Sequence, residues 1–164
     1  MTARLAPPFR RAYPYFVAIP TRWMDNDTYG HVNNVVYYSY FDTAVNRHLI
    51  EAGHLDIRSG PCIGLVVETA CQFHKALSFP ETIDAGLRVV QLGRSSVIYE
   101  IGLFRSGDDD AAGTGRFVHV WVDRTTRRPV AVPEPIRRVL TPLAAAGDAA
   151  RGSDSASSAR SGSR

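Results

Sequence analysis

The sequence has few cysteines, no long apolar run and no strong excess of one charge. Its two cysteines, Cys62 and Cys71, have no CxxC spacing and no neighbouring Cys/His cluster, so the pattern of a zinc site is missing. No apolar run reaches the roughly 20 residues that span a bilayer. The first residues, MTARLAPPFRR, lack the apolar stretch of a signal peptide. We therefore expect a soluble, cytoplasmic protein with two reduced thiols, no metal and no membrane span.

The charge balance also excludes some partners. The 164 residues carry a formal net charge of +3 at pH 7, and the pI of about 9.1 comes largely from scattered arginines. Nucleic-acid-binding domains gather basic residues on one face or along one helix, so we expect no nucleic-acid partner. A modest basic patch for a phosphorylated small molecule is compatible with this charge.

Length and composition predict one folded domain with two loose ends. Residues 144–164 contain only Ala, Gly, Ser, Asp and Arg, a composition that cannot form a core. We expect this tail to be disordered and dispensable for folding. Residues 1–12 are rich in Pro and Arg and predict a flexible N-terminus. The folded unit is then expected over residues 13–143.

Hydrophobic periodicity predicts one strand, one long helix and four further strands. Apolar residues at helical spacing indicate a helix over residues 34–52, with Asn33 or Asn34 as N-cap and Gly53 as C′ residue. The first half of this helix is apolar nearly all round, which predicts that other structure wraps it. Pro20 favours an edge position or a bulge in the first strand. The strands are expected at residues 13–23, 63–77, 82–93, 95–107 and 113–123, and a short closing helix at 133–140.

This order of elements predicts an α+β fold. In residues 117–123 valines alternate with aromatic and polar residues, and such period-two alternation is typical of antiparallel strands with two different faces. A single, largely apolar helix buries all its faces only if the sheet curls around it. We therefore expect an antiparallel β-sheet wrapped around one long central α-helix.

A dense polar segment stands directly before the expected helix. The stretch DNDTYGHVNN, residues 25–34, holds two aspartates, a glycine, a histidine and two asparagines. A carboxylate acts as a nucleophile or as a base that activates water, and a helix N-terminus offers unpaired N–H groups to an oxyanion. Taken by spacing alone, Asp27 is better explained as a turn residue bonded to local backbone.

The segment RWMDNDTYGHVNNVVYYSYFD, residues 22–42, resembles the hotdog-fold acyl-CoA thioesterases, and within them the 4-hydroxybenzoyl-CoA thioesterase-like family. The family pattern is an Asp-x-Asp, a nearby Gly, often His-Val-Asn-Asn, and a Tyr at the helix start. The likeness continues through residues 87–104 and 128–140, whereas residues 79–82 depart from the turn of many relatives. The matching positions are Asp25, Asp27, Gly30, His31, Val32, Asn33, Asn34 and Tyr37.

The resemblance implies roles for these residues. Asp27 is the implied nucleophile or general base, with His31 and Asn34 as the other catalytic residues, and no cofactor is implied. Asp25 organises the loop, pairs with Arg22 or contributes to substrate binding. The implied substrate-binding residues are Asp25, Gly30, Val32, Asn33, Tyr37, Glu68 and Arg94. Period-two spacing places Glu68 on one strand face with Gln72 and His74, from which it would reach a partner's site or only solvent.

Three functions remain open on these residues. The first is an acyl-CoA thioesterase that hydrolyses a thioester carried by coenzyme A or by an acyl carrier protein. The second is a hotdog dehydratase or hydratase, but those relatives usually place a catalytic His with an acid on the helix or its lead-in. The third is a non-catalytic acyl-CoA-binding domain. The family also implies a homodimer or homotetramer, with the site near the interface between subunits.

Overall fold

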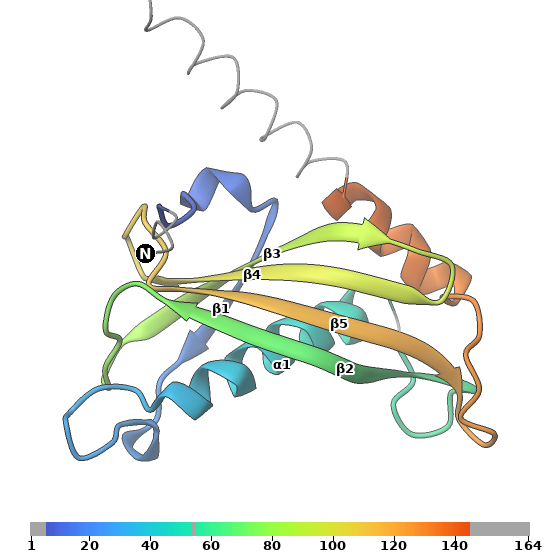
Figure 1. The fold of residues 1–164 in the computed structure, drawn as a ribbon, viewed down its shortest axis with the longest axis horizontal. Coiled ribbons are helices and arrows are strands. Elements are labelled where there is room, and N and C mark those ends of the chain that lie inside the picture. Colours follow the sequence, from blue (N-terminus) through green and yellow to red (C-terminus); the bar gives the residue numbers. More distant parts are fainter. Residues whose placement is uncertain (1–5, 54, 145–164) are drawn as a thin grey trace, which may run out of the picture.

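The computed structural model describes residues 6–53 and 55–144 of the chain. One helix lies against a five-stranded antiparallel sheet of strand order β1-β3-β4-β5-β2 (Figure 1). A further helical segment covers residues 134–144. The elements are α1 (Asn34–Glu51), β1 (Tyr15–Pro20), β2 (Cys62–Phe73), β3 (Thr82–Leu92), β4 (Ser96–Arg105) and β5 (Gly113–Asp123), with short 3-10 turns η1 (Arg10–Ala12) and η2 (Trp23–Asp25).

Four strands are shorter than the sequence predicted: β3 by one residue, β4 by three, β1 at both ends and β2 at its C-terminal end. The strand expected over residues 13–23 ends at Pro20, the last residue of the edge strand β1, because proline has no N–H to continue a ladder. The edge position predicted from this proline is confirmed. The strand expected over 63–77 ends at Phe73, because the next two N–H groups both donate to the carbonyl of Ala112 instead of continuing the ladder.

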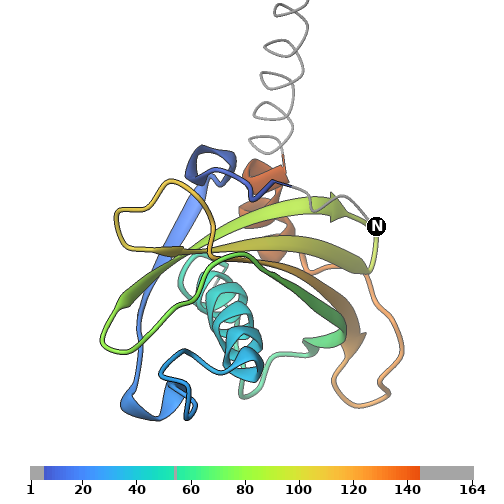
Figure 2. The ribbon, with the colours of Figure 1, turned by 60° about the vertical axis from the view of Figure 1, so that its left-hand side comes forward.

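The sheet curls around α1, as expected from the apolar helix. Figure 2 shows the sheet arching over α1. Two β-bulges interrupt its ladders, one in β2 between Val66 and Glu68 and one in β3 between Val89 and Gln91. A bulge strengthens the local twist of a strand, so these irregularities help the sheet to wrap the helix.

Helix α1 forms the centre of the core but is not covered on every side. Ala52, the last residue of the helix expected from apolar spacing, is exposed. The prediction that structure wraps the first half all round is wrong for this chain alone, since Val35 is 64% exposed and Tyr38 is half-buried. One side of the helix start is therefore open. The residues that α1 buries are Tyr37, Tyr40, Phe41, Ala44, Val45, His48 and Leu49.

The two ends of α1 are fixed by different means. Asn33 is the N-cap, and its Oδ1 accepts a hydrogen bond of 3.1 Å from the backbone N–H of Val35, as predicted. Gly53 follows the C-cap Ala52 but does not adopt the left-handed conformation of a glycine C′ residue. A Cβ on Gly53 would lie 2.7 Å from Cδ1 of Ile136. Glycine is therefore required here by the close approach of residues 134–144.

The chain ends extend the core beyond the sheet. The guanidinium of Arg10 pairs with Asp84 at 2.9 Å and donates through Nε to the carbonyl of Asp108. The helical segment 134–144 buries Ile136, Leu140 and Leu143, where a shorter helix over 133–140 was expected. Residues 1–5 and 145–164 lie outside the described part, so the flexible N-terminus, the disordered tail and the boundaries of the folded unit stay predictions.

Gly115→Ala tests how closely α1 approaches β5. A Cβ on Gly115 would fall 2.5 Å from Cε2 and Cζ of Phe41, whose ring is fully buried. Overpacking of this kind costs about 1–3 kcal/mol, so the urea midpoint should fall. Arg116→Ala is the control, because its exposed pair with Glu68 is worth at most about 1 kcal/mol. Equal midpoints for Gly115→Ala and the wild type would contradict this packing.

Candidate active site

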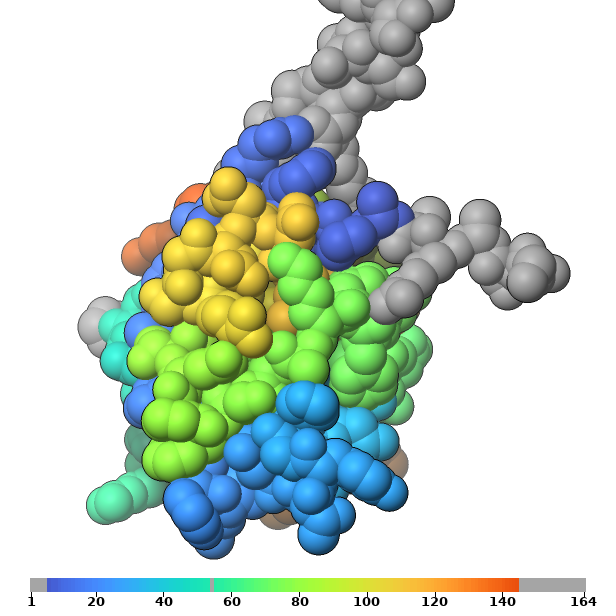
Figure 3. Space-filling view, turned by 90° about the vertical axis from the view of Figure 1, so that its left-hand side faces the viewer, coloured from blue at the N-terminus to red at the C-terminus, as the bar shows by residue number. Residues whose placement is uncertain are grey.

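The polar segment lies at one end of the molecule, where the loop before α1 meets the chain between β2 and β3. Figure 3 faces this end, with the loop in blue and the β2–β3 connection in green. Three hydrogen bonds among those that join these segments are Val32 N–H to the carbonyl of Leu77 at 2.7 Å, Phe79 N–H to Asn26 Oδ1 at 2.9 Å, and the Ser78 hydroxyl to the carbonyl of Gly30 at 3.2 Å. Segments far apart in the sequence are thereby held side by side.

The fully buried carboxylate of Asp25 organises this loop. It accepts hydrogen bonds from the Tyr40 hydroxyl at 2.7 Å and from the backbone N–H of Arg22 at 2.8 Å. The Arg22 guanidinium adds Nε at 2.9 Å and Nη2 at 2.8 Å. The expected pairing with Arg22 is confirmed, and the carboxylate is enclosed by these groups.

The protonation of Asp25 reflects two opposing effects. Burial opposes ionisation, but the hydrogen bonds from Tyr40 and Arg22 and the guanidinium charge outweigh it and lower the pKa of Asp25 below its ordinary value. Burial and the neighbouring Asp25 carboxylate raise the pKa of Tyr40. At neutral pH a carboxylate therefore faces a neutral hydroxyl donor.

Asp27 forms a tight turn of its own. Its backbone N–H donates to the carbonyl of His31 at 2.9 Å, and its carbonyl accepts from Gly30 at 3.1 Å. Gly30 has φ +81°, a conformation that favours glycine. Oδ1 of Asp27 accepts from the backbone N–H of Tyr29 at 2.8 Å, which is the turn role that spacing favoured. Oδ2 accepts no hydrogen bond from any residue that the structure describes, so one carboxylate oxygen is open.

The N-terminus of α1 presents an open donor next to this carboxylate. The N-cap Asn33 accepts from Val35 through its side chain and from Val36 through its carbonyl at 2.9 Å. The backbone N–H of Asn34 has no acceptor among the described residues. The helix dipole adds partial positive charge at this point, so an anion forming here would be stabilised.

Asp27 and Asn34 line the same concavity, which we name the inner hollow. Its volume of about 330 Å³ falls in the range of small-molecule sites. At one side the Tyr37 ring meets Phe73 edge-on, with centroids 5.0 Å apart. Burial raises the pKa of Tyr37 to about 12, so its hydroxyl stays neutral. The inner hollow is lined by Asp27, His31, Val32, Asn34, Tyr37, Phe73, His74, Lys75 and Ala76.

A second concavity, the outer hollow, also borders Asp27. Its volume is about 390 Å³. Asp27 is the one residue that belongs to both linings. The outer hollow is lined by Trp23, Asn26, Asp27, Thr28, Gly30, Phe79 and Pro80.

Four of the implied substrate-binding residues, Asp25, Asn33, Glu68 and Arg94, line neither hollow. Asp25 is enclosed within the loop, as described above. Glu68 of β2 forms an ion pair of 2.6 Å with Arg116 of β5. Glu100 of β4 lies opposite Arg116 on the other side of β5. Arg94 lies in the β3–β4 turn, where its carbonyl accepts from Val132 at 2.8 Å. Of the implied residues, Asp27, Gly30, His31, Val32, Asn34 and Tyr37 reach a hollow, while Asn33 caps the helix.

Sequence reasoning missed most of the residues that the β2–β3 connection supplies. Phe73, Lys75 and Phe79 line the hollows, although no local pattern links them to the polar segment much earlier in the chain. One signal was present, since Lys75 is the single lysine of the chain. Trp23, close before the Asp-x-Asp, was also missed, and its 83% exposure is visible only in the structure.

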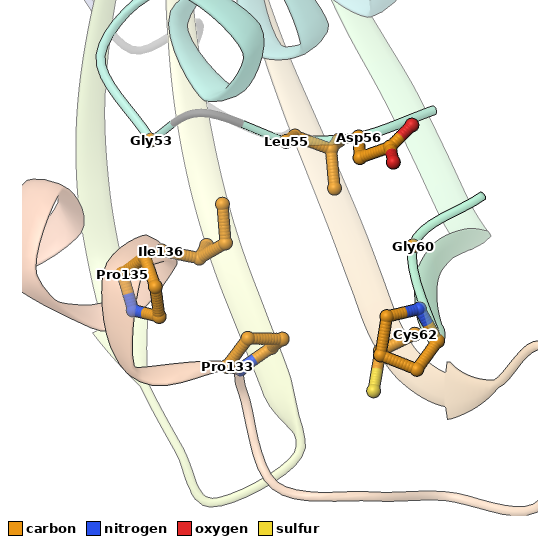
Figure 4. Close-up of a pocket in the computed structure, with 9 residues that line it drawn as sticks. Gly53, Leu55, Asp56, Gly60, Cys62, Pro133, Pro135 and Ile136 are labelled. Carbon is orange, nitrogen blue, oxygen red and sulfur yellow. The ribbon is translucent and has the colours of Figure 1, made fainter. Parts of the chain in front are cut away.

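Another cavity, of about 190 Å³, lies at the opposite end of α1 (Figure 4). The helix has 18 residues, so the two sites are separated by about 27 Å along its axis. The lining of this cavity includes Asp56 and Cys62. The Asp56 carboxylate accepts hydrogen bonds from the Ser59 hydroxyl and from the Arg58 backbone N–H. This mainly apolar cavity is also lined by Pro133, Pro135 and Ile136 at the start of the helical segment 134–144, and no residue of the polar segment 25–34 lines it.

Residues 6–53 and 55–144 show neither a metal cluster nor a membrane-spanning helix. No group of three or more His, Cys, Asp or Glu side chains in this part of the chain is arranged to hold a metal ion. No helix of this part is long and apolar enough to cross a membrane.

Residues 21–140 match the family model of the thioesterase-like superfamily. The chain belongs to this superfamily. The crystal structure of the PA5185 protein from Pseudomonas aeruginosa is 54% identical, covers 84% of this chain and 96% of its own, and has a TM-score of 0.82. No curated protein matches the chain.

Other solved thioesterases share this architecture. A thioesterase from Thermus thermophilus, complexed with coenzyme A and Zn, is 29% identical over 82% of this chain and 96% of its own, with a TM-score of 0.68. Slr0204 from Synechocystis, a 1,4-dihydroxy-2-naphthoyl-CoA thioesterase, is 14% identical over 79% and 96%, with a TM-score of 0.71, and shows the fold alone. The α+β hotdog fold of this superfamily member is thus confirmed.

Asp25→Asn should lower the free energy of unfolding at neutral pH and make it depend less on acid. Because the folded-state pKa is lowered, the carboxylate contributes its full stability above about pH 4, where an unfolded aspartate is ionised. That contribution is lost as pH falls through the folded pKa. We expect the variant to lose on the order of 1–2 kcal/mol at pH 7, since the exposed Arg22 is partly screened.

The check is the melting temperature of both proteins between pH 7 and pH 2. The wild-type curve should fall more steeply below about pH 4, and Asp42→Asn, on the exposed side of α1, should follow the wild type. Parallel curves for Asp25→Asn and the wild type would show that this carboxylate does not hold the loop.

Proposed function

We propose that this thioesterase-superfamily protein hydrolyses acyl-CoA thioesters, with Asp27 as nucleophile or general base and the N-terminus of α1 as oxyanion site. One observation carries the proposal: an open carboxylate oxygen of Asp27 and the unpaired N–H of Asn34 border the same hollow. Hydrolysis of an acyl group needs these two functions together. A cytoplasmic location stays a prediction from the sequence.

The reaction begins with the thioester carbonyl in the inner hollow. Sulfur donates weakly into this carbonyl, so the carbon is open to attack. Asp27 attacks it directly, or removes a proton from a water that attacks. The carbonyl oxygen becomes an oxyanion that accepts a hydrogen bond from Asn34 N–H, supported by the helix dipole.

The tetrahedral intermediate then collapses and the C–S bond breaks. The thiolate of coenzyme A leaves and takes up a proton. In the nucleophilic route a mixed anhydride with Asp27 remains, and water hydrolyses it to the free acid and the regenerated carboxylate. In the general-base route the acid forms directly. His31 positions Asp27 in either route, because its carbonyl accepts the Asp27 backbone N–H.

The acyl group is assigned to the deeper, apolar side of the inner hollow. Val32 and Tyr37 are 5% and 3% exposed there, and Phe73 lies against Tyr37. These walls offer apolar contact and no charge, which suits an aliphatic or aromatic acyl chain. His31 and Lys75 line the same hollow and supply its polar side.

Asp27→Asn is the decisive substitution. It preserves the size of the side chain and removes its charge, so turnover of acyl-CoA should fall by about a thousandfold, equivalent to roughly 4 kcal/mol of transition-state stabilisation. Thiol release across aliphatic and aromatic acyl-CoAs is the measurement. The melting temperature should change little, because Asn also accepts a hydrogen bond from Tyr29 N–H.

Asp25→Asn is the matched control within the Asp-x-Asp. After correction for its folded fraction, it should retain far more activity than Asp27→Asn, because its carboxylate lines neither hollow. A folded, fully active Asp27→Asn would refute the mechanism. A folded wild type that binds acyl-CoA but hydrolyses none would instead favour an acyl-CoA-binding domain.

The free edge of β2 supports a further part of the proposal, a homodimer formed through this strand. β2 is 12 residues long and pairs on one side only, with β5. Its exposed residues include Leu65, Val66 and Val67, at 36%, 45% and 60% exposure. A long apolar edge of this kind is a template for pairing with another chain. Phe73 ends β2 and lines the inner hollow, so a second copy on this edge would border the site.

Val67→Lys should weaken this association. A charge at the middle of the free edge opposes strand pairing, so light scattering should show a dimer or larger assembly for the wild type and a shift toward monomer for the variant. Val90→Lys, an exposed position of β3, is the matched control and should keep the wild-type mass. A fully active wild-type monomer at assay concentration would rule out the dimer as a requirement.

A further inference from the structure

Lys75 places a cation at the inner hollow. It is the single lysine of the chain, and it lines this hollow together with Asp27 and Asn34. Carboxylate oxygens of Asp108 and Asp110 lie 3.6 and 3.7 Å from its Nζ, which is longer than a hydrogen bond. Nζ makes no hydrogen bond with any residue of the described ranges. Its N–H donors are therefore available to a ligand.

Two other elements fix the backbone of Lys75. Its N–H donates to the carbonyl of Ala112 at 3.0 Å, and its carbonyl accepts from the Tyr37 hydroxyl of α1 at 3.4 Å. The N–H of His74 donates to the same Ala112 carbonyl at 2.8 Å. The chain that leaves β2 is thus joined both to the β4–β5 loop and to α1. The long Lys75 side chain therefore starts from a fixed point of the lining.

The β4–β5 loop, residues 106–112, is itself fixed by the N-terminal segment. The backbone N–H of Arg10 donates to the carbonyl of Asp109 at 2.8 Å, and Nε of Arg10 donates to the carbonyl of Asp108 at 2.8 Å. Figure 3 shows this loop in gold beside the green residues that follow β2. The two carboxylates near Lys75 thus belong to a fixed backbone. They attract the ammonium by charge and leave its N–H donors open.

The lining of the inner hollow combines apolar and polar groups. The buried Val32 and Tyr37 suit the acyl group of a thioester. With the acyl group against these residues, the sulfur on the other side of the carbonyl is left to the polar groups, which are supplied by His31, His74 and Lys75. A lysine side chain is a cation at neutral pH, so Lys75 brings a full positive charge to the sulfur side.

We propose that Lys75 stabilises the leaving thiolate of the thioester. When the C–S bond breaks, its electron pair stays on the sulfur, and the thiolate accepts a hydrogen bond from the Lys75 ammonium. A charge-assisted hydrogen bond of this kind is what the contacts of Lys75 with Asp108 and Asp110 lack. The attacking water supplies the proton that the thiol finally carries, so Lys75 keeps its own. This role rests on the proposed thioester hydrolysis.

A cation next to the sulfur matters most when the thiol is a poor leaving group. An alkyl thiolate keeps its charge on the sulfur, whereas an aryl thiolate spreads part of it into the ring and leaves more readily. S-benzyl and S-phenyl thiobutyrate differ in this respect, share one acyl group and have no carrier attached. The ratio of their rates therefore separates an effect on the leaving group from an effect on acyl binding.

Lys75→Met removes the cation and keeps the length of the side chain. Thiol release should show kcat/KM falling about tenfold more for S-benzyl than for S-phenyl thiobutyrate. Lys75→Arg keeps the charge and should restore most of the S-benzyl rate. Arg47→Gln is the matched control, since Arg47 also pairs with a carboxylate, is similarly exposed (51% against 43%) and lines neither hollow. This control should match the wild type on both thioesters.

The two aspartates near Lys75 act as positioning residues and are tested by the same ratio. Replacing both Asp108 and Asp110 by Asn should lower the S-benzyl to S-phenyl ratio about threefold, because the ammonium is then held less well. Asp109→Asn, at the exposed position between them, makes the same kind of charge change and should leave the ratio as in the wild type. An unchanged or higher ratio in the double variant would overturn the positioning role.

Butyryl-CoA, whose leaving group is an alkyl thiol, gives a second readout for Lys75→Met. The loss should fall on kcat and leave KM unchanged. A loss in KM alone would assign Lys75 to binding of the carrier and overturn the proposal, as would equal losses on the two small thioesters or full activity of the variant. Hydrolysis that needs Asp27 but not Lys75 would keep the hydrolase and refute this role. A folded wild type that hydrolyses no thioester would refute both.

Discussion

The buried carboxylate of Asp25 is the interaction on which the site depends. It connects Arg22 in the loop with Tyr40 in the second turn of α1. The backbone carbonyl of Asp25 also accepts the N–H of Asn33 at the helix start. The loop is therefore fixed to the helix at both of its ends. Asp27, two residues on, lies in a loop that this anchor fixes, and its own turn bonds to Tyr29, Gly30 and His31 complete its position.

The two aspartates of the Asp-x-Asp lie in different environments. Asp25 is enclosed and has its hydrogen-bonding capacity used, which suits a residue that holds structure. Asp27 is half-buried and uses one oxygen for its turn, while its other oxygen accepts no hydrogen bond from the described residues. Environment separates the two carboxylates where sequence shows only two aspartates with one residue between them.

Features that depend on one residue and its neighbours were predicted from the sequence. Features that depend on contacts between distant segments were missed or explained wrongly. Asn33 as cap and Pro20 at an edge follow from the chemistry of one residue and its neighbours, and both are confirmed. Gly53 was placed correctly after the helix but for the wrong reason, since packing by Ile136 decides it. Of the site, the segment before α1 was found, whereas Phe73 and Phe79 were missed because only tertiary structure brings them to Asp27.

The two edges of the sheet have unequal capacity for growth. β2 offers 12 residues with a bulge near the middle, whereas β1 offers six and ends in proline. In the language of polymer chemistry, the subunit is a monofunctional building block, with one reactive end and one blocked end. Pairing of two copies through β2, as proposed, would leave only the short β1 edges, whose terminal proline disfavours further edge-to-edge addition.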